Sequence, residues 1–243
     1  MFLLIGIARR LLVLVVVLAI PVVGGELLTR TLIGDAISSA VKSRIGVSPD
    51  VSLGSSPILL QLIHGRIDTA TVHAKNARIG GLPPMTLSAT LHDVHVSHLT
   101  SLQGAIGSLR VDAALGPAAV RDLLSTPACI ASMPSDVRVA LTATPRVLLF
   151  PGRIDLLPPA GRAAEVRLRP VAAGNAVLFR LSGVELGGAA ASNATLARAQ
   201  AQTSCSRSLA GLPFGISLVS ATARTGALEL AFTGANATFT ALG

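Results

Sequence analysis

The strongest constraint on this chain's fold is an apolar residue at every second position, run after run. In the stretch that begins at Arg66, Ala70, Val72 and Ala74 fall on one side and polar residues on the other. This alternation is typical of β-strands with one buried face. Further alternating runs are Leu87 to Val96, Leu109 to Leu115, Val137 to Ala143, Val166 to Arg169, Val177 to Leu181, Ile216 to Ala223 and Leu228 to Phe239. With no βαβ rhythm and no repeat of fixed period, the pattern predicts an antiparallel sheet.

One segment has the period of a helix instead. ELLTRTLIGDAISSAVKSRIG, residues 26–46, places apolar residues three and four positions apart, and Gly46 is expected to end it. Twenty residues make about 30 Å of helix with one apolar stripe. We therefore predict an α+β domain over residues 26–243, in which a strongly curved antiparallel β-sheet wraps around this long amphipathic helix.

Local signals refine this prediction. Serines before Pro57 predict a short capped apolar turn over SSPILLQLI, and short helices are expected at Pro117 to Leu124 and Ala194 to Gln202. In the Leu87 to Val96 strand the alternation slips by one position at Asp93, which predicts a β-bulge and hence a bend in the sheet.

Composition limits the functional classes. Charged residues are 13% of the chain, and apolar residues with glycine included are about 60%, against about 45–50% in soluble domains. There are six Phe, no Tyr and no Trp, so base-stacking platforms are lacking, and the net charge of +8 comes from scattered basic residues. We expect no nucleic-acid partner; the charge suits an anionic lipid surface, and GC-rich codon usage is an equally good explanation of the excess.

The N-terminus has the features of an export signal. Arg9 and Arg10 precede an uninterrupted apolar run from Leu11 to Val23. Residues 1–25 are therefore expected to act as a signal peptide or as a signal anchor. Either outcome places the rest of the chain in the periplasm or cell envelope, on the outer face of the cytoplasmic membrane.

The chain has two cysteines, Cys129 and Cys205. An even count in an exported chain favours a disulfide, and two buried free thiols are the alternative.

No catalytic, cofactor or metal site is predicted. His92, His95 and His98 are spaced by three, but a strand places His92 and His98 about 20 Å apart with His95 on the opposite face. No GxSxG motif is present, and the few acidic residues are better explained as solvated cross-strand partners than as a catalytic pair.

Three stretches carry a resemblance to a known family: VSLGSSPILLQLIHGRIDTATVHAKNARIG, the strand from Leu87 to Val96, and LPFGISLVSATARTGALELAFTGANATF. They resemble the actinobacterial LmeA-like phospholipid-binding proteins, formerly grouped as a domain of unknown function. The resemblance implies an exported envelope protein, a fold similar to tubular lipid-binding domains, a phosphoinositide-type phospholipid ligand and a role in lipomannan elongation.

Two functions fit these observations. The first is a non-catalytic lipid binder that holds acyl chains between the long helix and the concave sheet; the second is a solidly packed scaffold that partners an envelope glycosyltransferase. SSPILLQLI would touch the membrane or close the pocket in the first case and plug the β core in the second. Arg66, Lys75 and Arg78 are possible phosphate contacts. The expected lipid-binding residues are Leu32, Ile33, Ile37, Val41, Ile58, Leu59, Leu62, Ile63, Leu87 and Leu91.

Overall fold

The computed structural model describes residues 26, 28–35, 37–39, 41–42, 45–79, 82–98, 103–125, 129, 138, 145–157, 164–202, 205–209 and 212–240. The expected export segment, residues 1–25, lies outside these ranges. The side chains of Leu59 and Leu62 are also outside the described part.

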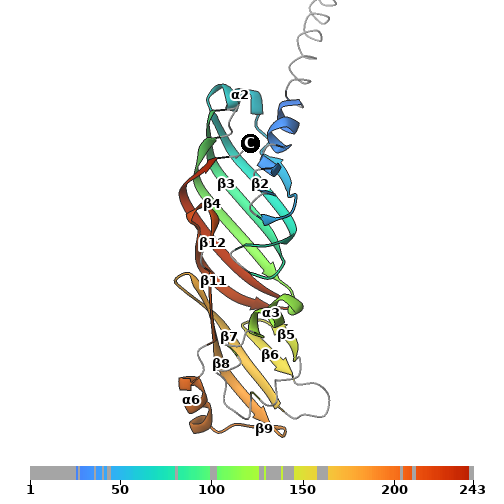
Figure 1. Cartoon of the computed structure of the whole chain (residues 1–243), viewed down its shortest axis with the longest axis vertical. Coiled ribbons are helices and arrows are strands. Elements are labelled where there is room, and N and C mark those ends of the chain that lie inside the picture. The colour runs from blue at the N-terminus through green and yellow to red at the C-terminus, as the bar shows by residue number, and fades with distance from the viewer. Residues whose placement is uncertain are drawn as a thin grey trace, which may run out of the picture.

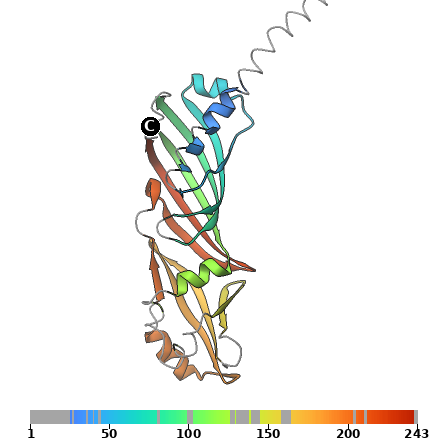
Figure 2. The same cartoon turned by 45° about the vertical axis from the view of Figure 1, so that its right-hand side comes forward.

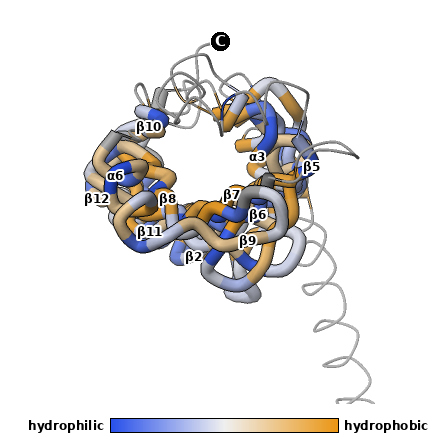
Figure 3. Tube along the Cα trace, turned by 90° about the horizontal axis from the view of Figure 1, so that it is seen from below, coloured by the Kyte–Doolittle hydropathy of each residue, from blue (hydrophilic) through white to orange (hydrophobic). Residues whose placement is uncertain are grey.

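The strands form two open antiparallel sheets that follow one another along an elongated molecule (Figure 1). The first sheet has the order β1-β2-β3-β4-β12-β11, and the second has the order β10-β8-β7-β6-β5 with β9 added beside β8. Seen along the long axis, the strands are arranged around that axis instead of lying flat (Figure 3). The antiparallel, β-rich class is therefore confirmed, but the chain builds two sheets where the sequence analysis expected one.

The elements of the first sheet are β1 (Asp50–Leu53), β2 (Arg66–Ala77), β3 (Met85–His98), β4 (Gln103–Leu115), β11 (Ser217–Arg224) and β12 (Ala227–Thr240). Those of the second are β5 (Arg146–Phe150), β6 (Arg153–Leu157), β7 (Ala164–Ala173), β8 (Ala176–Leu186), β9 (Ala189–Ala190) and β10 (Cys205–Ser208). Short helical elements are α2 (Ile58–Ile63), α3 (Pro117–Leu124), α6 (Asn193–Gln202) and a 3-10 turn, η1 (Pro213–Gly215).

Residues 26, 28–35, 37–39, 41–42 and 45 are helical and are called the N-terminal helical segment below. Gly46 follows it with φ +76°, a left-handed conformation that suits a glycine at a helix end. The segment lies against the first sheet (Figure 2). Within the described ranges, no helix is both long enough and apolar enough to span a bilayer.

A crease runs across the first sheet where the sequence pattern slips. Asp93 in β3 and Asn236 in β12 have φ values of +54° and +52°, and both lie opposite Gly107 in β4, the strand between them. A Cβ atom on Gly107 would lie 2.8 Å from the Cβ of Asp93, so only glycine fits this close approach. On the side of β3 away from β4, Asp68 of β2 lies opposite Asp93. Residues of four neighbouring strands thus lie in one row at the crease.

The predicted bulge at Asp93 was wrong, because the pairing of β3 with both neighbours keeps one register across that residue. No residue is inserted; all strands slip together, so their buried faces stay on the same side. The pairing of β3 shifts register at two other places. With β2 the shift lies between Ala74 and Ala77 of β2, and with β4 it lies between Val96 and His98 of β3.

The two sheets join through their hairpin turns. The backbone N–H of Gly152, in the β5–β6 turn, donates to Ala223 O at 2.9 Å, and that of Gly226, in the β11–β12 turn, donates to Leu149 O at 3.2 Å. Buried side chains from both sheets form one continuous apolar core.

Outcomes elsewhere are mixed. The helix at Pro117–Leu124 is confirmed, and the weaker one is confirmed as Asn193–Gln202. The strand predicted at Val137 to Ala143 is wrong at Arg138, its one described residue, which is helical. The sequence analysis missed β5 and β6, whose short runs lie on either side of the Gly152 turn.

Candidate functional site

An apolar groove lies between the N-terminal helical segment and the first sheet. It contains about 1000 Å³ of space between atoms, including the part open to solvent. Every lining residue in the described ranges has an apolar side chain. These residues are Ile37, Val41, Ile45, Ala70, Val72, Ala74, Ile79, Leu87, Ala89, Leu91, Val94, Ile106, Leu109, Val111, Phe214 and Ile216.

Small residues in the middle of the sheet leave this space open. Ala89 of β3 pairs with Val72 of β2 on one side and with Val111 of β4 on the other, so the three form a row across the groove floor. Ala70 and Ala74 lie on the same side of β2. Because an alanine methyl fills less space than a larger side chain would, these positions leave the floor hollow.

The crease explains how residues at odd spacing share this floor. Leu91 and Val94 are three positions apart in β3, as are Ile106 and Leu109 in β4, yet all four line the groove. In a regular strand, residues three apart point to opposite faces. The left-handed conformation at Asp93 and the matching slip in β4 restore them to one face.

The opposite wall comes from the N-terminal helical segment. Ile37, Val41 and Ile45 recur every four residues, which places them on one helix face, toward the sheet. The backbone N–H of Arg78, just beyond β2, donates to Ile45 O at 3.1 Å and fixes the end of this wall. Phe214, with φ +57°, contributes to the lining from η1.

Polar contacts tie α2 to the start of the helical segment. Glu26 Oε1 accepts from the backbone N–H of Ile58 at 2.7 Å and pairs with Arg30 Nε at 2.8 Å. The Arg30 guanidinium donates to Gly54 O and to Ser56 O, each at 3.0 Å. We call Glu26 and Arg30 the clamp, because they bind one end of α2 to the segment that carries the groove wall.

The structure brings some of the expected lipid-binding residues together. Ile37, Val41, Leu87 and Leu91 line the groove. Ile33 is half-buried against the core, and Ile58 is fully buried in it, outside the groove lining.

Leu32 and Ile63 are not part of the groove. Leu32 is 69% exposed and Ile63 is 78% exposed. The structure does not describe where the side chains of Leu59 and Leu62 point.

The three expected phosphate contacts have different surroundings. Arg66 pairs with Asp93 at 2.8 Å and with Asp68 at 3.4 Å. Lys75 is exposed and alternates with the groove-lining Ala74, so it lies on the opposite face of the sheet. Arg78 is exposed and lies next to Ile79, a groove-lining residue.

The sequence pattern indicates only some properties of the other lining residues. Ala70, Val72 and Ala74 share a parity that the sequence shows, but their small size gave no sign that they floor a hollow. Ile79 and Phe214 lie outside the regular alternation, so no pattern identifies them as lining residues.

His92, His95 and Asp155 are not among the groove-lining residues. His92 and His95 are exposed, and no group of three metal-ligating side chains is found in the described ranges. In the second sheet, burial raises the pKa of Asp155, an effect that the nearby Arg153 guanidinium opposes at 3.3 Å. Asp155 is 3% exposed and is not among the groove-lining residues.

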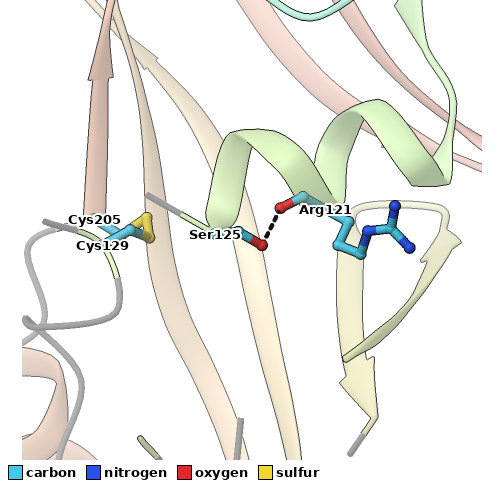
Figure 4. The surroundings of a disulfide bond; sticks show 4 residues. All are labelled: Arg121, Ser125, Cys129 and Cys205. Carbon is cyan, nitrogen blue, oxygen red and sulfur yellow. Dashed lines mark hydrogen bonds between the residues drawn. A yellow bond between two sulfur atoms is a disulfide. The ribbon is translucent and has the colours of Figure 1, made fainter. Parts of the chain in front are cut away.

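The two cysteines form a disulfide, as the even count favoured. Cys129 follows α3 in the chain, and Cys205 begins β10, so the bond ties the α3 region to the edge of the second sheet (Figure 4). Ser125 Oγ donates to Arg121 O at 2.8 Å at the end of α3 nearest to this bond.

A family model described as LmeA-like phospholipid-binding matches residues 24–233. The chain belongs to this family. The match covers the whole groove and most of both sheets. Comparison with curated proteins and with solved structures found no match. A groove whose described lining residues are all apolar is consistent with a family that binds phospholipid.

Proposed function

We propose that this protein binds phospholipid in the apolar groove, with the acyl chains between the N-terminal helical segment and the sheet, and that it does so without catalysis. The observation that carries the proposal is a groove whose described lining residues are all apolar, in a member of a phospholipid-binding family. Each acyl CH₂ removed from water contributes about 0.8 kcal/mol, so about ten buried methylenes correspond to the roughly 8 kcal/mol of micromolar affinity.

Arg78 is the charged residue best placed to meet the lipid phosphate. It is exposed, it precedes the lining residue Ile79, and its backbone is bonded to Ile45 on the opposite wall. Arg66 is already paired with two carboxylates, and Lys75 projects from the other face of the sheet. Arg78→Ala is expected to weaken uptake of an anionic phospholipid about tenfold, in line with the loss of one charge-assisted hydrogen bond.

The cellular setting is part of the same proposal. The basic and apolar pattern of residues 1–25 supports export, and a disulfide fits an oxidising compartment outside the cytoplasm. We propose that residues 26–243 act as one lipid-binding unit in the cell envelope, akin to tubular lipid-binding domains. From the family resemblance we add a phosphoinositide-type ligand and a role in lipoglycan or envelope lipid metabolism. An envelope glycosyltransferase is the partner proposed for the alternative scaffold function.

Native mass spectrometry of the purified full chain tests the proposal. The expected result is a co-purified phospholipid that a labelled phospholipid displaces. A protein that is empty and takes up no labelled phospholipid would overturn lipid binding and favour the scaffold function.

A further inference from the structure

Large apolar side chains are exposed at one end of the molecule. The described part of the chain has five such side chains, and four of them belong to the N-terminal helical segment and α2. Leu28 and Leu32 are 68% and 69% exposed, and Leu60 and Ile63 are 57% and 78% exposed. Both views of the ribbon place these two elements at the same end of the long axis (Figures 1 and 2). We call these four residues the tip.

The clamp holds together the two elements that form the tip, the N-terminal helical segment and α2. Glu26 and Arg30 lie on the face of the helical segment that meets the chain around Ile58 and Ser56. Leu28 and Leu32, four positions apart, share another face of the same segment, and Leu60 and Ile63 are neighbours on the surface of α2. The polar contacts are thus used inside the tip, and the apolar side chains face outward.

The chain itself indicates what the tip meets. The uninterrupted apolar run Leu11 to Val23 ends only five positions before Leu28. Such a run enters a lipid bilayer, either as a signal peptide or as an anchor. In the described part of the chain, the exposed Leu28 and Leu32 therefore follow closely after a membrane-seeking segment.

The exposed face also turns polar at a short distance from this run. Beyond Leu32, the exposed residues of the helical segment are Asp35, Ser39 and Lys42. At 1.5 Å per residue, Asp35 lies about 10 Å along the helix from Leu28. The exposed apolar part of this face is therefore confined to the first turns of the segment, next to the apolar run.

We propose that the tip docks on a phospholipid bilayer, with Leu28, Leu32, Leu60 and Ile63 in the interface between headgroups and acyl chains. The same helical segment carries Ile37, Val41 and Ile45 on its groove side. Docking therefore brings one wall of the groove to the membrane. This surface goes beyond the proposed groove function and can be tested separately from it.

The absence of Trp from the chain makes a direct test available. Leu32→Trp and Ile63→Trp each give the full chain a single fluorophore at the tip. Val219→Trp is the matched control, because Val219 is 58% exposed but lies in β11, away from the tip. Each variant is combined with vesicles of phosphatidylcholine and phosphatidylglycerol, with and without brominated acyl chains.

The tip variants are expected to emit at shorter wavelength with vesicles and to be quenched about twofold or more by brominated lipid, because an interfacial side chain lies near the acyl boundary. The control is expected to change in neither respect. Equal quenching at all three positions, or at none, would overturn the proposal. A blue shift that needs no lipid and grows with protein concentration would also overturn it and would assign the tip to a second copy of the chain.

The result does not depend on the groove. Tip quenching in a chain that carries no phospholipid would support docking and refute the proposed groove function. A chain that carries phospholipid but shows no quenching at the tip would support the groove function and refute docking.

Discussion

Filling the groove at Ala89 is the sharpest test of where lipid binds. Ala89 lies in the middle of the floor, between Val72 and Val111 in the neighbouring strands, and its side chain faces the empty space. Ala89→Phe adds a ring to that space without changing any charge or hydrogen bond. The ring takes the place of about four acyl methylenes, which corresponds to about 3 kcal/mol of binding free energy, or roughly a hundredfold in Kd.

Ala235→Phe is the matched control. Ala235 is an exposed residue of β12 in the same sheet and is not among the groove-lining residues. The same ring at this position is expected to leave the affinity for a fluorescent phospholipid unchanged.

Titration with a fluorescent phospholipid gives the Kd of both variants, and urea unfolding followed by circular dichroism gives their stability. The expected result is a large loss of affinity for Ala89→Phe alone, with both proteins folded. Wild-type affinity in folded Ala89→Phe would refute the placement of acyl chains on this floor. An equal loss in Ala235→Phe would refute it as well, because the effect would not depend on the groove.

Three further predictions concern stability. Replacing both Cys129 and Cys205 by Ser is expected to lower the unfolding free energy by about 4 kcal/mol, because the disulfide closes a loop over a separation of 76 residues; a urea midpoint unchanged from the oxidised wild type would contradict this. Burial raises the pKa of Asp155 above its ordinary value of 3.8, so ionisation costs the folded state stability as pH rises through and above that value. Asp155→Asn removes this cost, and its advantage in unfolding free energy over the wild type is expected to grow between pH 3 and pH 7; a difference that is constant or shrinks would refute the reasoning. Gly107→Ala is expected to destabilise by about 1–3 kcal/mol, since its Cβ would lie 2.8 Å from that of Asp93, whereas Gly183→Ala would meet only the flexible Arg167 side chain at 3.4 Å; equal urea midpoints for the two variants would count against the crease.

Much of the candidate site follows from periodicity. Ile37 and Val41 share a helix face, and Leu87 and Leu91 share a strand face, whatever the rest of the chain does. All four line the groove. Leu32 has the same apolar character as Ile37 and belongs to the same predicted stripe, yet it is exposed. The pattern identifies apolar positions, but which neighbour covers them depends on how the segment is placed.

The sequence by itself determined the antiparallel, β-rich class, the helical period of residues 26–46 and the grounds for a disulfide. These are local or compositional properties: side-chain period follows backbone geometry, and an even cysteine count needs no coordinates. Only the tertiary structure decided that the strands divide into two sheets and that Asp93, Gly107 and Asn236 align in one crease. Both depend on the register between strands far apart in the chain. The groove exists because that register brings Val72, Ala89 and Val111 into one row beneath the helical segment, and no single strand carries that information.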